Sequence, residues 1–316
     1  MNRPPPEEWA SELRAELPND RRYLIGVSGG RDSVVLLHWL LSLGYRRLVV
    51  CHFEHGLRGR AGKADARFVA RLAEKQGLAL EAGSAQIGVL AAERKQSIET
   101  TARQERLAFF ERVGKRQRCR TIFLAHQADD QVETFLLNLF RGAGGRGLGA
   151  MRPRVRHGGL EIVRPLLGVW RAEIDRYVAE HRLKFREDPT NEVLYARRNR
   201  LRHKLIPLLE KKFGRNIRST IWRAAMLLAE EEDFLEERTP AGLTTNEHLS
   251  VGEVRKLALT LQRRVIRRWL VNRDVAGIGF ELVEATRKLL TRDSPAKINL
   301  AHGRHLRRRA GKIFVE

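Results

Sequence analysis

The chain has 316 residues, of which 42% are hydrophobic, and this composition indicates globular domains and excludes a disordered or fibrous chain. Lysine and arginine number 60 against 38 acids, so the net charge of +22 favours a polyanionic partner such as nucleic acid, although a basic surface that only faces solvent is the alternative. No apolar run approaches the roughly 18 residues of a membrane span, and the N-terminus lacks the apolar segment of a secretory signal. Only Cys51 and Cys119 are present, without C-x-x-C spacing, which fits a reducing cytoplasm and argues against zinc or disulfide frameworks.

Apolar strands alternate with helices through the first two thirds of the chain. After a leader helix within residues 1–20, we expect strands at Tyr23–Val27, Arg47–Phe53, Leu78–Ala82, Thr121–Ala125 and Leu160–Leu166. We expect helices at Val34–Leu41, Ala61–Gln76, Ser97–Arg118, Asp129–Phe140 and Trp170–Arg182. This alternation predicts an α/β fold with a doubly wound, mostly parallel sheet that is covered on both faces.

The rest of the chain is predicted to be helical and basic. A loop over Phe185–Thr190 precedes a basic helix over Tyr195–Phe213 and a further helix over Asn216–Glu237. We expect an α/β domain over residues 1–215, a helical connector over 216–240 and a small, largely helical domain over 241–316. The last part contains a basic helix around Arg263–Arg268 and a basic hairpin at its end.

The first strand ends in Ser28-Gly29-Gly30-Arg31-Asp32-Ser33, and a helix follows. Two adjacent glycines allow a tight turn or the close approach of a ligand. Backbone N–H groups at a helix N-terminus bind phosphate, and the two serines can add hydroxyl donors. Asp32 would repel bare phosphate, so its presence predicts a Mg²⁺ ion between them. The alternative is an ordinary strand–turn–helix with a Ser or Asp cap.

Three carboxylates begin the helix that follows the fourth strand: Asp129, Asp130 and Glu133. This point lies at the carboxyl edge of the predicted sheet, where ligands of α/β proteins bind. Asp130 and Glu133 share one helix face, which predicts that they bind a cationic ligand, either Mg²⁺ or an ammonium group. The alternative is that these acids only complement the helix dipole. His126 is a candidate general acid or phosphate ligand, although a single histidine is more often structural.

Four further segments carry charged residues, histidines or glycines that could lie near the same edge. His52–Arg58 leaves the second strand and can flank an adenine or a ribose. Glu99, Arg103 and Arg106 share one side of the long helix, either as an ion-pair stripe or as the rim of a cleft. Arg197–Lys204 is the densest basic run of the first part of the chain and is predicted to contact phosphates, with a solvated face as the alternative. Gly142–Gly147 contains G-x-G-x-x-G but follows a helix, so we expect a flexible loop beside the cleft and no dinucleotide site.

Taken in order, these segments resemble the tRNA(Ile)-lysidine synthetases of the PP-loop ATP pyrophosphatase superfamily. The matching segments are Ser28–Ser33, His52–Arg58, Glu99–Arg106, Ala125–Thr134, Arg141–Leu148, Arg164–Leu167, Glu187–Asn191 and Arg198–Arg202. The resemblance implies a ligase that forms a carbon–nitrogen bond. It implies that ATP, with Mg²⁺, adenylates cytidine 34 in the CAU anticodon of isoleucine tRNA, and that free L-lysine then replaces AMP at C2 to give lysidine.

The resemblance also implies roles for individual residues. ATP would be bound by Ser28, Gly29, Gly30, Arg31, Asp32, Ser33, His52 and Phe53, with Asp32 on Mg²⁺. The catalytic residues would be Asp130, Glu133, His126, Arg103 and Asp32. Lysine and tRNA would be contacted by Asp129, His55, Arg58, Arg106, Arg198, Asn199 and Arg202, and tRNA also by residues 241–316. The protein would be cytoplasmic, without a membrane partner, and a homodimer is left open.

Three alternatives remain at this point. A tRNA thiolation enzyme would share the phosphate loop but needs a cysteine that carries sulfur, and Cys51 and Cys119 lack the usual spacing. A synthetase that amidates a small molecule would leave the net charge of +22 unexplained. A non-catalytic RNA-binding protein with a vestigial nucleotide site would not need both the loop and the carboxylates.

Overall fold

The computed structural model describes residues 7–186, 197–291 and 296–316 and divides the chain into two compact units, Met1–Ala229 and Glu230–Glu316. The division falls within the helix that we expected to be the connector. Among the described residues, no helix combines the length and the apolar character needed to cross a membrane. The predicted segment Glu187–Asn191 lies outside these ranges.

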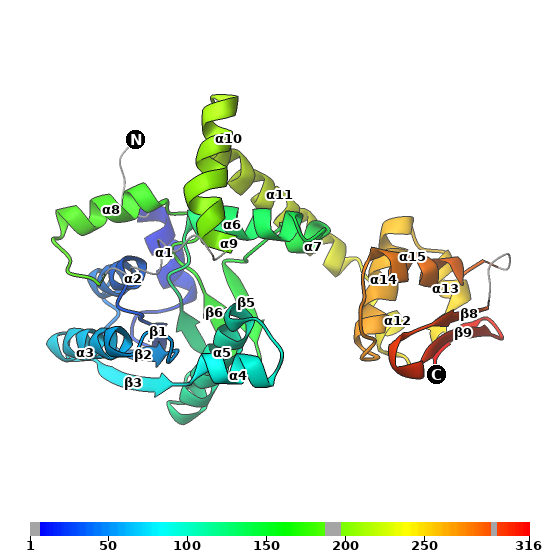
Figure 1. Cartoon of the computed structure of the whole chain (residues 1–316), viewed down its shortest axis with the longest axis horizontal. Helices are drawn as coiled ribbons and strands as arrows, with labels where there is room; N and C mark the ends of the chain where they lie inside the picture. The colour runs from blue at the N-terminus through cyan, green and yellow to red at the C-terminus, as the bar shows by residue number, and fades with distance from the viewer. Residues whose placement is uncertain (1–6, 187–196, 292–295) are drawn as a thin grey trace. The chain divides into compact units, whose positions relative to one another are not determined.

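The first unit is built on a six-stranded sheet with the order β3-β2-β1-β4-β6-β5 (Figure 1). The strands are β1 (Tyr23–Gly26), β2 (Leu48–Glu54), β3 (Ala79–Ser84), β4 (Thr121–Phe123), β5 (Arg154–His157) and β6 (Leu160–Val163). All neighbours pair in parallel except β5 and β6. Because the first strand lies in the middle and the chain winds outward to both sides, the predicted doubly wound α/β fold is confirmed.

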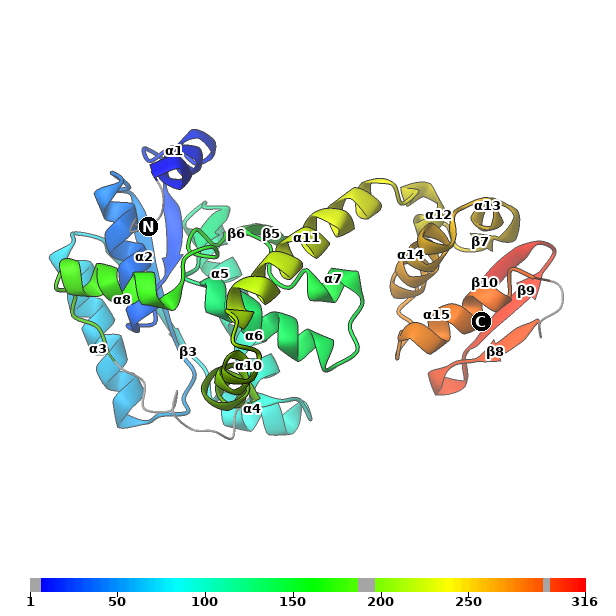
Figure 2. The same ribbon diagram turned by 90° about the horizontal axis from the view of Figure 1, so that it is seen from above.

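Helices cover both faces of this sheet (Figures 1 and 2). One apolar cluster joins the strands to α1 (Glu7–Glu16), α2 (Arg31–Ser42), α3 (Arg60–Lys75) and α8 (Arg171–Glu180). A second joins the opposite face to α4 (Ile87–Glu93) and α5 (Ile98–Arg116). Ser97 accepts a hydrogen bond from the Thr100 amide at 3.1 Å, which confirms it as the cap of α5. The carboxyl edge of the sheet stays open for the loops that follow the strands.

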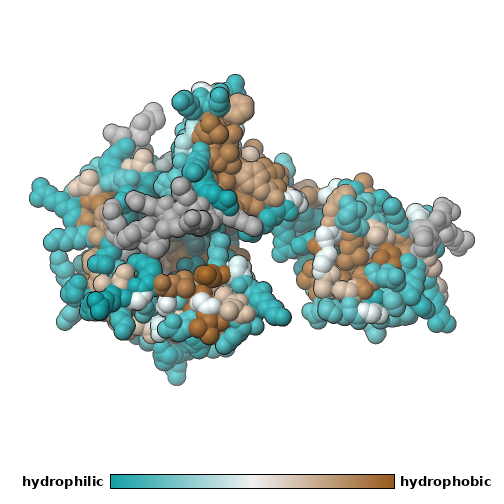
Figure 3. Space-filling model, in the orientation of Figure 1, coloured by the Kyte–Doolittle hydropathy of each residue, from teal (hydrophilic) through white to brown (hydrophobic). Residues whose placement is uncertain are grey.

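The remaining helices of this unit lie at that edge. They are α6 (Ala128–Leu139), α7 (Gly145–Leu148), α9 (Arg197–Arg200), a π-helical turn (Leu201–Leu205), α10 (Ile206–Phe213) and α11 (Ile217–Glu237), which continues into the second unit. Val132 and Leu136 of α6 pack against Leu201 and Ile206 in a separate apolar cluster. Figure 3 shows a mostly hydrophilic surface with an apolar strip over α10, where Leu208 and Phe213 are exposed.

Several predicted boundaries were wrong. Helix α2 begins three residues earlier than expected, because Arg31–Ser33 form its first turn. Strand β6 ends at Val163 rather than Leu166, because Pro165 has no N–H group to continue the ladder. Strand β5 was missed because it is an edge strand of mostly exposed, charged residues. The second half of the expected Gly142–Gly147 loop is the helical turn α7.

The second unit combines helices with an antiparallel sheet. Its elements are α12 (Ala241–Thr245), β7 (Leu249–Ser250), α13 (Val251–Arg255), α14 (Leu259–Val271), α15 (Phe280–Lys288), β8 (Lys297–Asn299), a 3₁₀ turn (Ala301–Gly303), β9 (His305–Arg309) and β10 (Lys312–Val315). The strands are ordered β7-β10-β9-β8. The predicted terminal hairpin is β9–β10, and the fully buried Trp269 lies in the apolar cluster between helices and sheet.

Candidate active site

Four loops meet at the carboxyl edge of the sheet because they follow four neighbouring parallel strands, β2, β1, β4 and β6. These four loops, together with α3, α5, α8 and the segments around α9–α11, line a cavity of about 1380 Å³. The predicted site residues in its lining are Ser28, Gly30, Arg31, Asp32, Ser33, Phe53, His55, Arg58, Arg106, His126, Asp129, Asp130 and Arg202. The phosphate loop and the carboxylates of α6 therefore face one space.

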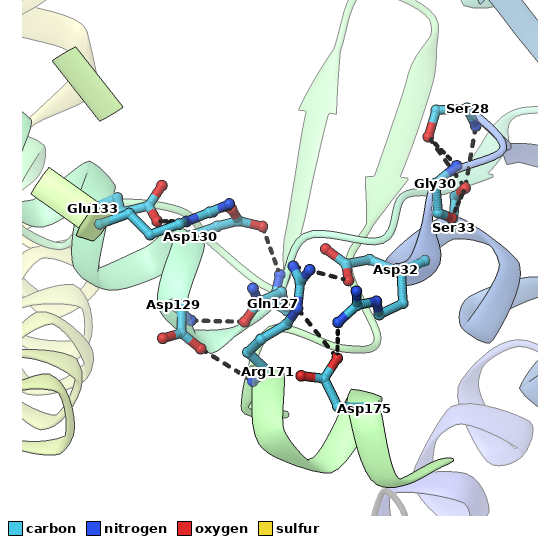
Figure 4. A network of polar contacts seen from close by, with 12 residues as sticks. Ser28, Gly30, Asp32, Ser33, Gln127, Asp129, Asp130, Glu133, Arg171 and Asp175 are labelled. Carbon is cyan, nitrogen blue, oxygen red and sulfur yellow. Dashed lines mark hydrogen bonds and ion pairs between the residues drawn. The ribbon is translucent and has the colours of Figure 1, made fainter. Parts of the chain in front are cut away.

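The phosphate loop is shaped by its own hydrogen bonds (Figure 4). The Ser33 hydroxyl donates to the Gly30 carbonyl at 2.8 Å and accepts from the Ser28 amide at 3.2 Å. Gly29 has φ +91°, a conformation that favours glycine, and its carbonyl accepts from the Arg186 amide at 2.9 Å. Because Gly30 is the N-cap of α2 and offers no side-chain cap, the first turn of this helix can donate to an anion.

Asp32, in the first turn of α2, lies beside cationic side chains (Figure 4). Its Oδ1 is 3.6 Å from Nη1 of Arg171, and Nε of Arg171 is 3.3 Å from Oδ1 of Asp175. Asp175 also pairs with Arg31. Burial raises the pKa of Asp32 to about 6, against the opposing effect of Arg171. Thus α8 brings two charged side chains to the phosphate loop.

The residues present fit a Mg²⁺ ion at Asp32. Its Oδ1 is buried and has no hydrogen-bond partner among the described residues. A carboxylate oxygen beside a phosphate loop is the ligand that Mg²⁺ prefers. No group of three or more histidine, cysteine or acidic side chains suited to a metal occurs in the described ranges, so phosphate oxygens and water would have to supply the other ligands.

The N-terminus of α6 places its acids in different roles (Figure 4). Asp130 accepts from the Gln127 amide at 3.1 Å through Oδ2, so one oxygen caps the helix. Asp129 accepts from the Arg171 amide at 3.1 Å and pairs with Arg218 at 3.2 Å, so both its oxygens bind this chain. The alternative of acids that serve the helix end is therefore partly correct, and only Oδ1 of Asp130 is not used in this way.

Glu133 lies one turn further along α6 and is only 1% exposed. Its Oε1 accepts from Nε of Arg202 at 2.6 Å, and Nη2 of Arg202 reaches Oδ1 of Asp130 at 3.4 Å. Burial raises the pKa of Glu133 to about 7, against the opposing effect of Arg202, and burial also raises the pKa of Asp130. The two carboxylates therefore bind a cationic group, and in this structure that group is Arg202.

His126 lies among guanidinium groups at the ends of β4 and β6. Its Nδ1 accepts from Nε of Arg164 at 3.2 Å. Burial lowers the pKa of His126 well below its ordinary value, with further lowering by Arg164, Arg106, Arg103 and Arg198. Nε of Arg106 is buried without a hydrogen-bond partner in the described part of the chain. This cluster has the charge to bind an anion.

The segment after β2 contributes unequally to the cavity. Phe53 and His55 line it, and burial, followed by the charge of Arg106, lowers the pKa of His55 to about 4. Arg58 also lines it and donates to Asp65 at 2.6 Å. His52 lies outside the lining, since its ring bonds to the Val27 carbonyl at 2.9 Å. Its role in nucleotide binding stays a prediction.

Other predicted residues lie around the cavity rather than in its lining. Arg198 pairs with Glu99 at 3.2 Å, and Arg103 is exposed. Gly29, Glu133 and Asn199 lie outside the lining as well. In the second unit, Arg263, Arg264 and Arg268 pair with glutamates of that unit, so part of their charge is offset within it.

Sequence reasoning missed several residues of the site: Asp65, Arg164, Trp170, Arg171, Asp175, Phe185, Arg186, Glu210 and Arg218. Most are single charged residues outside any motif, and several have partners far away in the chain, such as Arg218 with Asp129 and Arg186 with Asp65. Arg164 alone had a signal, because it begins a segment of the family resemblance directly after a strand.

Two family models match this chain. A PP-loop domain matches residues 7–209, and a TilS substrate binding domain matches residues 249–314. Together they account for most of both structural units.

Curated relatives agree with these matches. A tRNA(Ile)-lysidine synthase of Thermosynechococcus vestitus is 36% identical over 92% of this chain and 85% of the relative. One of Geobacter sulfurreducens is 39% identical over 88% of this chain and 61% of the relative. One of Solibacter usitatus is 35% identical over 83% of this chain and 60% of the relative. The chain therefore spans about 60% of the length of the last two relatives.

A solved structure supports the fold alone. A U34-tRNA thiolase NcsA of Methanococcus maripaludis, with a [4Fe-4S] cluster, superposes with a TM-score of 0.55 at 18% identity, over 71% of this chain and 79% of that chain. At this identity the likeness concerns the fold and carries no argument about the chemistry.

Proposed function

Since the chain belongs to the tRNA(Ile)-lysidine synthase family, we propose that it joins lysine to C2 of cytidine 34 in the CAU anticodon of isoleucine tRNA. The observation that carries this proposal is that the phosphate loop and Asp130 line one cavity. An enzyme that activates a base with ATP and then attacks it with an amine needs both features in one place. The reaction consumes ATP and releases AMP and pyrophosphate.

In the first step, O2 of cytidine attacks the α-phosphorus of ATP, and the bond to pyrophosphate breaks. The amides of the first turn of α2 would bind the departing pyrophosphate, since preset N–H donors stabilise charge that develops in a transition state. Mg²⁺ on Asp32, when bound, would offset part of this charge. Arg31 and Arg171 lie close enough to Asp32 to add to the positive potential.

In the second step, the ε-amine of lysine attacks C2, and the bond from C2 to O2 breaks as AMP leaves. The amine must lose a proton, because only the neutral form is a nucleophile. Asp129 and Asp130 of α6 both line the cavity, and because both oxygens of Asp129 already bind this chain, we assign Asp130 the contact with the lysine ammonium. Glu133, with a pKa raised to about 7 by burial, is suited to accept a proton near neutral pH.

The positive residues supply the polyanion contacts of this proposal. The guanidinium groups of Arg103, Arg106 and Arg198 lie near His126, where the adenylate phosphate or the anticodon backbone would bind. Basic residues of the second unit, which matches a substrate binding domain, would contact tRNA elsewhere. Free L-lysine as the amine and the cytoplasm as the location are parts of the same proposal.

The thiolation alternative is not favoured by the cysteines. Burial raises the pKa of Cys51 to about 12 and also raises the pKa of Cys119, so neither is a thiolate at neutral pH. An iron–sulfur cluster is ordinarily bound by three or four cysteines, and this chain has two.

The test uses purified protein, ATP, Mg²⁺, radiolabelled lysine and an isoleucine tRNA transcript with the CAU anticodon. A transcript with uridine at position 34 and the Asp32→Ala variant are the controls. We expect acid-stable label only on the cytidine transcript, and none with Asp32→Ala. Pyrophosphate release without label would reject lysine as the nucleophile, and tRNA binding without either signal would favour the non-catalytic alternative.

A further inference from the structure

The hydrogen bond between Arg164 and His126 determines where the imidazole proton lies. A guanidinium group has only donors and keeps its charge over the physiological range. Nε of Arg164 donates to Nδ1 of His126 at 3.2 Å, so Nδ1 must be the acceptor and carry no proton. A neutral ring then carries its single proton on Nε2.

The fold fixes this contact firmly. Arg164 follows β6 and His126 follows β4, and the two strands are parallel neighbours with Phe123 opposite Val163. The Leu124 amide also donates to the Val163 carbonyl at 2.9 Å, which extends the pairing to the point where both side chains leave the sheet. Arg164 is 4% exposed and has further bonds, from Nη1 to the Arg152 carbonyl and from its amide to the Pro153 carbonyl, both at 2.8 Å.

The surroundings also oppose a second proton on the ring. Burial lowers the pKa of His126 well below its ordinary value, and Arg164, Arg106, Arg103 and Arg198 lower it further. Each of these residues is cationic, and they come from α5, from the end of β6 and from α9. His126 lines the cavity, whereas Arg164 lies outside the lining. The half of the ring away from Arg164 is thus the part available to a ligand.

We propose that Arg164 is a positioning residue that locks His126 in the neutral Nε2–H tautomer, so that the ring is a fixed hydrogen-bond donor to an anionic oxygen and does not act as a base. The oxygen belongs to a phosphate group, since the guanidinium groups around His126 favour an anion and the buried Nε of Arg106 has no hydrogen-bond partner within the described ranges. This part of the inference rests on the proposed function, which puts the nucleotide in the cavity. The tautomer itself does not depend on it.

The first test needs neither ATP nor tRNA, so its failure is distinct from failure of the proposed function. The full chain is labelled with ¹⁵N-histidine, and the signal of His126 is identified by its loss in His126→Gln. Long-range ¹H–¹⁵N spectra should show a neutral Nε2–H ring between about pH 6 and 8. An Nδ1–H ring, or a ring that titrates in this range, would overturn the proposal.

Arg164→Gln and Arg154→Gln form a matched pair of variants. Arg154 pairs with Glu161 within the β5–β6 hairpin and with Glu16, and in the described part of the chain it neither bonds to His126 nor lowers its pKa, so its loss should leave the His126 signal unchanged. Arg164→Gln should give a mixture of tautomers, and an unchanged signal in the folded variant would contradict a positioning role. If Arg164→Gln does not fold, the measurement on the unaltered protein still decides the tautomer.

The role of the donor is tested with two replacements of His126. Glutamine keeps an N–H donor but cannot act as a base, whereas alanine removes both. The rate of adenylation, followed by pyrophosphate release, should fall by about 10²- to 10³-fold in His126→Ala, as for other lost oxyanion donors, and clearly less in His126→Gln. Equal losses in both variants would reject the donor role.

Discussion

Nε of Arg202 lies 2.6 Å from Oε1 of Glu133, a carboxylate that is only 1% exposed. The basic run Arg197–Lys204 therefore does more than present charge to solvent or RNA, because one of its arginines neutralises a buried acid of α6. Lysine, the proposed nucleophile, carries the same charge as Arg202. Its ammonium group must share Asp130 with this arginine or replace it there.

Replacing Arg202 with alanine should destabilise the first unit. The change leaves Glu133 buried without its partner, and we expect a loss of about 2 kcal/mol, below the ~3–5 kcal/mol of fully buried pairs because Arg202 is partly exposed. The loss should grow as pH rises through 7, where Glu133 ionises. Urea unfolding measures the effect.

Arg200→Ala is the matched control, since it removes an exposed arginine from the same run. It should leave the urea midpoint nearly unchanged while weakening tRNA binding at low salt. Adding Glu133→Gln to Arg202→Ala should restore part of the lost stability. Equal midpoints for Arg200→Ala and Arg202→Ala would show that the ion pair contributes nothing.

Asp32→Asn should make the protein more stable at neutral pH. The folded-state pKa of Asp32 is about 6 against an ordinary 3.8, so the folded protein holds this proton more tightly than the unfolded chain. Stability is therefore lost as pH rises from about 3.8 to about 6, and this cost, at most ~3 kcal/mol, persists above pH 6. Asparagine does not ionise, so the variant avoids this cost, although Arg171 loses its ion pair with Asp32.

The measurement is the urea midpoint of Asp32→Asn and of the unaltered protein at pH 4 and pH 7.5, conditions chosen on either side of about 6. Asp175→Asn, which removes a more exposed carboxylate from the same cluster, is the control. The urea midpoints of Asp32→Asn and of the unaltered protein should differ little at the lower pH. At the higher pH the midpoint of Asp32→Asn should be clearly higher. If Asp32→Asn is less stable than the unaltered protein at both pH values, burial of the ionised Asp32 does not destabilise the fold.

The two glycines of the phosphate loop should respond differently to alanine. Gly29→Ala forces a side chain to adopt φ +91°, at a cost of about 1–2 kcal/mol. Gly30 has φ −72°, and a Cβ there would meet only the Ser28 hydroxyl at 3.4 Å. Gly30→Ala should therefore change the thermal midpoint little while still hindering the approach of phosphate.

Thermal unfolding of both variants decides this, with pyrophosphate binding by calorimetry as the second measurement. We expect a lowered midpoint in Gly29→Ala alone and weakened pyrophosphate binding in both. A normal midpoint in Gly29→Ala would mean that the loop relaxes to an ordinary conformation.

Neither cysteine should be needed for activity. Cys51→Ala and Cys119→Ala should ligate lysine at rates within about twofold of the unaltered protein, because both thiols are buried with raised pKa values. In the native protein neither thiol should react with a disulfide reagent, and both should react in urea. Loss of activity in Cys51→Ala with an intact fold would reopen the thiolation alternative.

The elements that could be predicted from the sequence are those with a local signal. Residues that are adjacent in the sequence are enough to indicate the strands β1, β2 and β4, the cap at Ser97 and the phosphate loop. Contacts between residues that are distant in the sequence have no such local signal. Nothing near Glu133 indicates that Arg202 would neutralise it, and nothing near His126 indicates that Arg164 would bind its Nδ1. These contacts exist because β4 and β6 are neighbours in the sheet and because the segment around α9 packs beside α6. Only the structure shows this arrangement.

The pairing of β1 with β4 has a consequence for how the chain folds during its synthesis. Leu24 lies opposite Ile122, so the central strands are brought together across a long stretch of chain, and such pairing makes folding slow. During synthesis the phosphate loop emerges early, but the residues that contact it, Arg171 and Asp175 of α8 and the Arg186 amide that bonds to Gly29, come only at residues 171–186. A nascent chain therefore cannot bind nucleotide in its native manner until that stretch has left the ribosome, and cellular ATP can stabilise only chains that have completed the sheet.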